Sequence, residues 1–203
     1  MLLPNRPEAE RLLDEAGSLN PGGWIAHSRN VGDAAARIAV ETGLDPDAAR
    51  VMGMLHDIGR RFGKSRFRHV ITGYRYLTDL GYDDAARLSL SHSFMLPDLG
   101  IFGDGLDGTP EEIDYVRKWL AVAEFDDYDR LIQFCDILAL PEGFCLLEKR
   151  MVDAAMRLGV TPLSPRKWRA IFDLKDYFER RMGRSVYSLL PGVAQTTFGG
   201  EFL

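Results

Sequence analysis

The placement of the histidines constrains the fold of this chain more than any other feature. All four fall in one stretch, where they stand at helical spacing from apolar residues. They are His27, His56, His69 and His92. Burying several titratable side chains without partners is costly, so one shared cation is the simplest way to keep them inside. The sequence therefore predicts helices whose inner faces meet around these histidines.

A histidine and an aspartate stand side by side in the middle of this stretch, within Leu55-His56-Asp57-Ile58-Gly59. An imidazole and a carboxylate in adjacent positions reach one cation only if the backbone turns both to the same side. We expect Gly59 to end the helix just after the pair, and Leu55 to anchor the preceding turn in the core.

Apolar residues at helical spacing, separated by Gly and Pro, predict an all-α bundle of about seven to nine helices. Asp45-Pro46 and Thr109-Pro110 each have a capping side chain followed by proline, which indicates a helix start. No alternating strand pattern is seen. We expect one domain over residues 1–183, with a core at 24–140 and C-terminal helices at 144–182.

Two segments lack helical periodicity. Residues 94–109 are rich in Gly, Asp and Pro, so we interpret them as a loop or a lid. Residues 184–203 form an apolar, irregular tail that either packs back as a strand-like arm or contacts a second subunit of a homodimer.

Composition narrows the class of protein. A net charge of −5 argues against a dedicated nucleic-acid surface. Two cysteines, Cys135 and Cys145, are too few for a disulfide framework. No apolar run approaches the roughly 18 residues of a membrane span, and no signal-peptide pattern opens the chain. We therefore expect a cytoplasmic protein that does not enter the membrane.

The order of these residues resembles the HD-domain superfamily of metal-dependent phosphohydrolases, in its HDIG variant. That pattern has an upstream His, the His-Asp pair and a distant Asp, and two-metal members add two histidines between the pair and the Asp. The matching positions, within residues 24–139, are His27, His56, Asp57, His69, His92 and Asp136.

The resemblance implies a metal site. It assigns one ion to four ligands, His27, His56, Asp57 and Asp136. Asp57 would bridge to a second ion held by His69 and His92; alternatively, those two histidines contact substrate phosphate over a single ion. Nitrogen and carboxylate ligands suit Fe, Mn, Co, Ni or Zn, and the sequence leaves that choice open.

Basic residues follow the His-Asp pair. Arg60 stands where many relatives carry a lysine that faces the metal centre, so it would clamp phosphate, or else satisfy carbonyl groups at a helix end. Arg61 and Lys64 continue a loop that either recruits phosphate or is simply solvated. Lys149 and Arg150 could close the pocket from the other side, or pair with Glu148.

The resemblance thus implies a metal-dependent phosphohydrolase that cleaves a phosphoester or phosphoanhydride of a nucleotide or related small molecule. A metal-activated water would attack phosphorus, with Asp57 and Arg60 as the catalytic residues. Two alternatives stay open. One is a non-catalytic regulatory module that binds a nucleotide, and the other is a di-iron oxygenase similar to inositol oxygenase.

Overall fold

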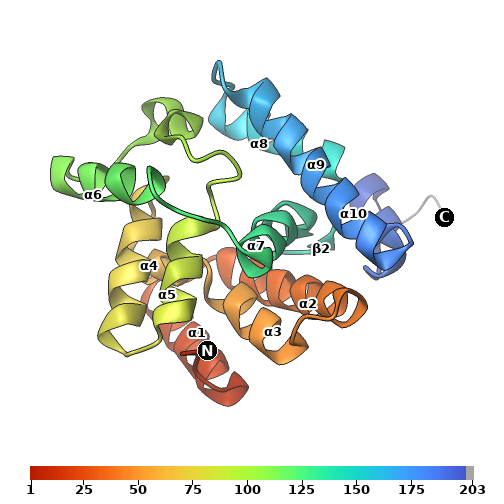
Figure 1. The fold of residues 1–203 in the computed structure, drawn as a ribbon, viewed down its shortest axis with the longest axis horizontal. Helices are drawn as coiled ribbons and strands as arrows, with labels where there is room; N and C mark the ends of the chain where they lie inside the picture. The colour runs from red at the N-terminus through yellow and green to blue at the C-terminus, as the bar shows by residue number, and fades with distance from the viewer. Residues whose placement is uncertain (200–203) are drawn as a thin grey trace.

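The computed structural model describes residues 1–199, and residues 200–203 of the predicted tail lie outside that range. The described part is almost entirely helical, which confirms the all-α prediction (Figure 1). Its α-helices are α1 (Arg6–Leu19), α2 (Trp24–Thr42), α3 (Pro46–Leu55), α4 (Arg68–Asp79), α5 (Asp83–Ser91), α6 (Pro110–Leu120), α7 (Asp127–Leu138), α8 (Leu147–Leu158), α9 (Ser164–Met182) and α10 (Val193–Phe198). The 3-10 helices are η1 (Ile58–Phe62), η2 (Leu99–Gly105) and η3 (Val186–Ser188), and the short strands are β1 (Ala139–Leu140) and β2 (Gly143–Phe144).

Several helices begin where a side chain accepts hydrogen bonds from the first turn. Asp45 caps α3 in this way, and Asp126 caps α7. Thr109 and Glu112 form a reciprocal capping box at the start of α6. The helix starts predicted at Asp45 and Thr109 are therefore confirmed, and local sequence sets where these helices enter the bundle.

Helix α7 lies in the centre of the molecule, with α2 and α3 on one side and α8 and α9 on the other (Figure 1). The largest hydrophobic cluster joins α2, α7 and α9, and Phe134 stacks on Phe178 at its middle with ring centroids 5.7 Å apart. Helices α4 and α5 pack as a pair beside α3, and α6 contacts α4. The core therefore surrounds α7, the helix that carries Asp136.

Helices α2 and α3 touch backbone to backbone. A Cβ added to Gly53 would lie 2.7 Å from the Cα of Gly32, which is closer than side chains allow. This approach brings the rings of His27 and His56, which come from these helices, to 5.3 Å between centroids. Gly32 and Gly53, which are not among the proposed metal ligands, thus allow the close approach of the helices that carry the two histidines.

The C-terminal tail is more regular than expected. Residues 184–199 contain η3 and the short helix α10 rather than a strand-like arm, so that alternative is wrong. Val186, Leu190 and Val193 are buried in the main cluster, which explains why this stretch is apolar. The hydroxyl of Tyr187 accepts a hydrogen bond from the backbone N–H of Leu147, and the tail is fixed to the start of α8.

A two-strand hairpin separates α7 from α8. The strands β1 and β2 pair antiparallel, with Ala139 opposite Phe144. The turn redirects the chain from the centre of the bundle to the outer pair α8–α9 (Figure 1). Among the described helices, none combines the length and the apolar character that a membrane span requires.

Candidate metal centre

The structure brings together the six residues proposed as metal ligands. They come from five helices or helix ends: His27 from α2, His56 and Asp57 from the end of α3, His69 from the first turn of α4, His92 from the end of α5, and Asp136 from α7. Five of them make two groups of three that could hold a metal ion. One group is His27, His56 and Asp57, and the other is Asp57, His69 and His92. Asp57 belongs to both groups.

The His-Asp pair turns to one side because the helix changes type there. Helix α3 ends at Leu55, and after Asp57 the chain continues as η1, whose residues include Gly59. Nε2 of His56 consequently lies 3.7 Å from Oδ2 of Asp57.

The expectation that Gly59 ends the helix is therefore wrong. Gly59 lies where η1 touches α4, and a Cβ added there would lie 2.0 Å from the carbonyl oxygen of His69. The residue must be small because α4 has to approach closely enough to bring His69 to Asp57.

Backbone carbonyls orient three of the four imidazoles. Nδ1 of His27 donates to the carbonyl of Ala139 at 3.2 Å, and Nδ1 of His56 donates to that of Gly53 at 2.7 Å. Nδ1 of His92 donates to the carbonyl of Ser89 at 2.8 Å. A carbonyl can only accept, so each Nδ1 carries the hydrogen and each neutral ring presents its Nε2 lone pair. Metal-binding histidines are commonly held in this way.

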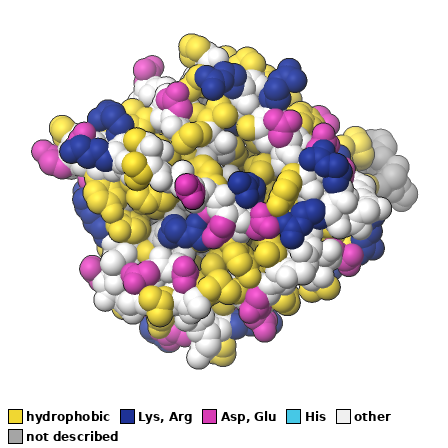
Figure 2. All heavy atoms as spheres, in the orientation of Figure 1, with side chains coloured by type: hydrophobic (Ala, Val, Ile, Leu, Met, Phe, Trp, Pro, Cys, Tyr) yellow, Lys and Arg dark blue, Asp and Glu magenta, His cyan; other side chains and the backbone are white. Residues whose placement is uncertain are grey.

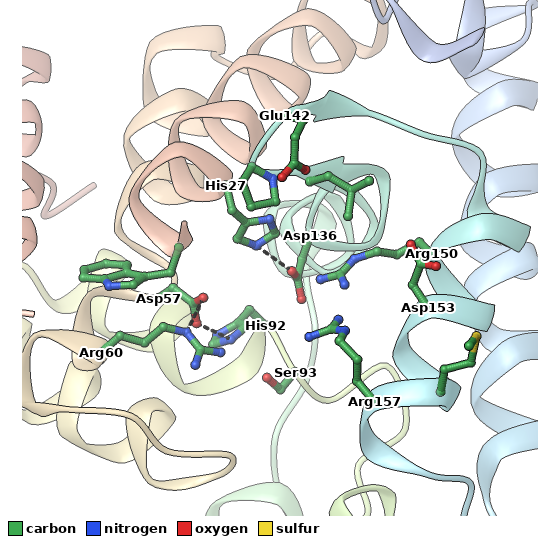
Figure 3. Close-up of a pocket in the computed structure, with 14 residues that line it drawn as sticks. His27, Asp57, Arg60, His92, Ser93, Asp136, Glu142, Arg150, Asp153 and Arg157 are labelled. Atoms are coloured by element: carbon green, nitrogen blue, oxygen red, sulfur yellow. Dashed lines mark hydrogen bonds and ion pairs between the residues drawn. The ribbon is translucent and has the colours of Figure 1, made fainter. Parts of the chain in front are cut away.

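The rings of His27 and His92 point toward the carboxylates of Asp136 and Asp57 (Figure 3). Nε2 of His27 lies 3.0 Å from Oδ1 of Asp136, and Nε2 of His69 lies 3.2 Å from Oδ1 of Asp57. The Nε2 atoms of His69 and His92 are 3.4 Å apart. At His27, whose Nδ1 carries the hydrogen, the Nε2 lone pair faces a carboxylate oxygen, and either a shared cation or an added proton makes that contact attractive.

Unpartnered polar atoms test whether a metal fits. Nε2 of His56 and Oδ1 of Asp57 are buried and make no hydrogen bond among the described residues. Leaving such an atom unsatisfied costs about 1–3 kcal/mol. Both atoms belong to the groups of potential ligands, and a divalent ion would accept lone pairs from both. The residues therefore fit a transition metal.

Burial keeps the inner imidazoles neutral. It lowers the pKa of His56 and of His69, and it lowers the pKa of His92 to about 3. A neutral imidazole is the form of histidine that binds metals.

The carboxyl groups stay ionised despite their burial. Burial alone raises the pKa of Asp57, but the Arg60 guanidinium and the imidazoles of His56 and His69 outweigh it and hold that pKa well below its usual range. Burial likewise raises the pKa of Asp136, and contact with His27 more than reverses the change. Both carboxylates are thus available as anionic ligands.

Arg60 lies directly against the bridging carboxylate. Its Nε donates to Oδ2 of Asp57 at 2.5 Å, and its Nη1 donates to the carbonyl of Ser65 at 3.3 Å. The side chain also lines the cavities on both sides of the centre. A guanidinium in this position neutralises part of the charge on Asp57 and can still meet an anion in the cavity.

A cavity of about 610 Å³ opens onto the centre. Its lining includes His27, Asp57, His92 and Asp136 on one wall, and Arg150 and Arg157 of α8 on the other. The two arginines project toward Asp136 across the cavity (Figure 3). On the face of the molecule seen in Figure 2, side chains of both charges gather near the middle, and no histidine is visible. The cavity that opens onto the buried centre is thus lined by charged side chains of both signs.

The basic residues predicted around the site lie in different places. Lys64 lines a second, adjoining cavity. Arg61 is absent from the lining of either cavity: its guanidinium lies 3.9 Å from the ring centroid of Tyr76 and pairs with Glu15 at 2.8 Å. The side chain of Arg61 thus turns toward α1 and α4 and away from both cavities.

The opposite wall differs partly from expectation. Lys149 pairs with Asp153 at 2.9 Å, whereas Arg150 lines both cavities. Arg157 and Lys167 were not anticipated. Arg157 stands seven residues after Arg150, and that spacing on one helix face could have indicated a shared role.

The segment 94–109 closes one side of the second cavity. Ile101 and Phe102 of η2 contribute to its lining. The carboxylate of Asp107 accepts hydrogen bonds from the backbone N–H groups of Arg66, Phe67 and Arg68. The segment is thus tied to the start of α4, and its movement as a lid stays a prediction.

Comparison with known proteins identifies the domain that holds these residues. The family model described as HD domain matches residues 24–140. Neither a search of curated proteins nor a search of solved structures found a match. The matched range contains all six proposed ligands and ends before α8 and α9.

Proposed function

Because the chain belongs to the HD domain family, we propose that it is a metal-dependent phosphohydrolase acting on a nucleotide or a related small phosphorylated molecule. The observation that carries the proposal is the geometry of Asp57. This buried carboxylate lies in two groups of potential ligands at once and faces a cavity whose opposite wall carries Arg150 and Arg157 beside Asp153.

The proposed ligands divide between two positions. His27, His56, Asp57 and Asp136 would hold one ion, and Asp57, His69 and His92 would hold the other. Divalent ions in such a site lower the pKa of a bound water and neutralise charge on a phosphoryl oxygen. The carbonyl groups that accept from Nδ1 keep the Nε2 lone pairs aimed inward.

The rest of the cavity suits an anionic substrate. Arg60 on one side and Arg150 and Arg157 on the other line it with guanidinium groups, which bind phosphate well. Its volume of about 610 Å³ lies within the common range for small-molecule sites. In this proposal Arg60 stabilises negative charge that develops on the phosphoryl group, while the α8 arginines orient it.

Replacement of the bridging carboxylate tests the proposal. We expect Asp57→Ala to lose bound metal and the hydrolysis of nucleotides while keeping its helical circular-dichroism spectrum. Asp114→Ala is the matched control, because Asp114 is partly exposed on α6 and pairs only with Arg117 and Lys118 among the described residues. Full activity of Asp57→Ala would refute the proposed mechanism.

The same assays separate the other two functions. Nucleotide binding without release of phosphate, by protein that contains metal, would favour a regulatory module. Uptake of O₂ that depends on an organic substrate would favour an oxygenase. A cytoplasmic location and a homodimer remain part of the proposal.

A further inference from the structure

Helices α8 and α9 line a second cavity, of about 350 Å³, together with η2 and the segment from Arg60 to His69 beside the metal centre. We propose that this cavity binds a second phosphate group, so that the preferred substrate is an organic di- or polyphosphate. The inference rests on the proposed hydrolase function. It depends in part on Arg150 of α8 and Lys167 of α9, which lie beyond residue 140, where the match to the HD domain model ends.

The two cavities adjoin. Their linings share Arg60, Ser93, Asp136, Arg150 and Arg157. A phosphate held against these shared residues therefore has the histidine-rich centre on one side and the second cavity on the other. Adjacent phosphates of a di- or polyphosphate are joined through one oxygen and lie close together. The next phosphate of the same substrate would therefore enter the second cavity.

Lys167 supplies a positive charge inside the second cavity. This lysine of α9 lines the cavity, is half-buried, and forms no ion pair within the described part of the chain. Lys175 of the same helix is different, since it pairs with Glu179 at 2.6 Å. A partly desolvated ammonium without an ion-pair partner is unfavourable, and an anionic ligand would compensate its charge.

Arg150 adds a second cation to the same wall. Its Nε is buried and makes no hydrogen bond among the described residues. Burial lowers the pKa of Lys167; the Asp136 carboxylate raises that pKa and Arg150 lowers it again. Two cations that repel each other in a partly desolvated cavity are the arrangement that a phosphate group relieves.

Apolar side chains complete the cavity. Phe102 comes from η2, and Trp168 and Ile171 come from α9. Aromatic and aliphatic walls around a few polar groups are typical of sites for organic ligands rather than for free phosphate. The cavity therefore suits the organic part of the substrate together with its second phosphate.

Binding to the metal-free protein tests the site without any catalysis. Calorimetry should show inorganic pyrophosphate binding more tightly than inorganic phosphate. Lys167→Met should weaken pyrophosphate binding by roughly tenfold or more, as expected for loss of a charged hydrogen bond. Lys118→Met is the control, because Lys118 is exposed on α6. Equal binding of both anions by the wild type, or an unchanged affinity in Lys167→Met, would overturn the inference.

Kinetics of the metal-loaded protein give a second readout. We expect Lys167→Met to reduce the ratio of kcat/KM for adenosine 5′-diphosphate to that for adenosine 5′-monophosphate by about tenfold. Lys167→Arg, which keeps the charge, should retain most of that ratio. An equal loss on both substrates would contradict a second-phosphate site. Absence of hydrolysis on every phosphate compound would instead remove the proposed function, and the pyrophosphate measurements would still decide the inference.

Discussion

Gly59 contributes no ligand, but its replacement by alanine should disturb the proposed metal centre. A Cβ at this position would lie 2.0 Å from the carbonyl oxygen of His69 and 2.6 Å from the backbone nitrogen of Gly73. Real Cβ atoms essentially never come within 3.0 Å of such atoms. The backbone of His69 must therefore move away by about 1 Å, the difference between 2.0 and 3.0 Å.

The movement acts on both stability and metal binding. Insertion of a methyl group into a tightly packed contact costs about 1–3 kcal/mol, and here both neighbours are backbone atoms that cannot rotate aside. Metal sites tolerate ligand distances within about 0.2 Å, which is much less than the required shift. We expect Gly59→Ala to lower the free energy of unfolding by about 3 kcal/mol relative to the wild type. The variant should also lose the ion assigned to Asp57, His69 and His92.

Denaturant unfolding and elemental analysis of the purified variant measure the two effects. Gly17→Ala is the matched control: Gly17 lies inside α1, and its added Cβ would meet only the flexible side chain of Ile25, at 3.1 Å. Alanine favours a helix over glycine by about 1 kcal/mol, so this control should be as stable as the wild type or slightly more so. A Gly59→Ala protein with wild-type stability and metal content would refute the reasoning. Lower stability with unchanged metal content would refute only the link between packing and ligand position.

Three further predictions concern single groups. His92→Ala should reduce the metal content from two ions per chain toward one, measured by elemental analysis, and an unchanged content would exclude His92 as a ligand. Arg61→Ala should change kcat/KM by less than about twofold but lower the free energy of unfolding by about 1 kcal/mol, because it removes the contact with Tyr76 and the pair with Glu15. In the metal-free protein the pKa of His92 is lowered to about 3, against 6.5 for an ordinary histidine. Between these two pH values the unfolded chain binds more protons than the folded chain. The free energy of unfolding should therefore decrease as the pH is lowered, with His92 contributing about 1.4 kcal/mol per pH unit, as measured by urea unfolding from pH 7 to pH 4. A flat profile would contradict the neutral, buried state of this imidazole.

The proposed metal ligands are the residues whose positions sequence reasoning predicts best. His56 and Asp57 adjoin in the chain, and helical periodicity is enough to turn His27 and His92 inward. The periodicity also predicts the all-α class, because its signal is repeated in every long helix. The helix start at Thr109 is predictable for a similar reason, since the capping box lies within four consecutive residues.

Local sequence patterns do not predict contacts between segments that are distant in the chain. Arg61 sits in a basic loop, yet its direction depends on Tyr76 and Glu15, which stand far from it in the chain. Lys167 has ordinary helical neighbours, and only the packing of α9 near α8 reveals its place in a cavity. The tail lacks periodicity because η3 and α10 are too short to show one.

The carbonyl groups that hold Nδ1 of His27, His56 and His92 have a thermodynamic consequence. Since the rings are fixed before any ion arrives, metal uptake loses little conformational entropy, and most of the binding free energy appears as added resistance to unfolding. A chelator should then lower the melting temperature while the native fold persists. We therefore expect a preorganised metal site rather than one that its ion must assemble.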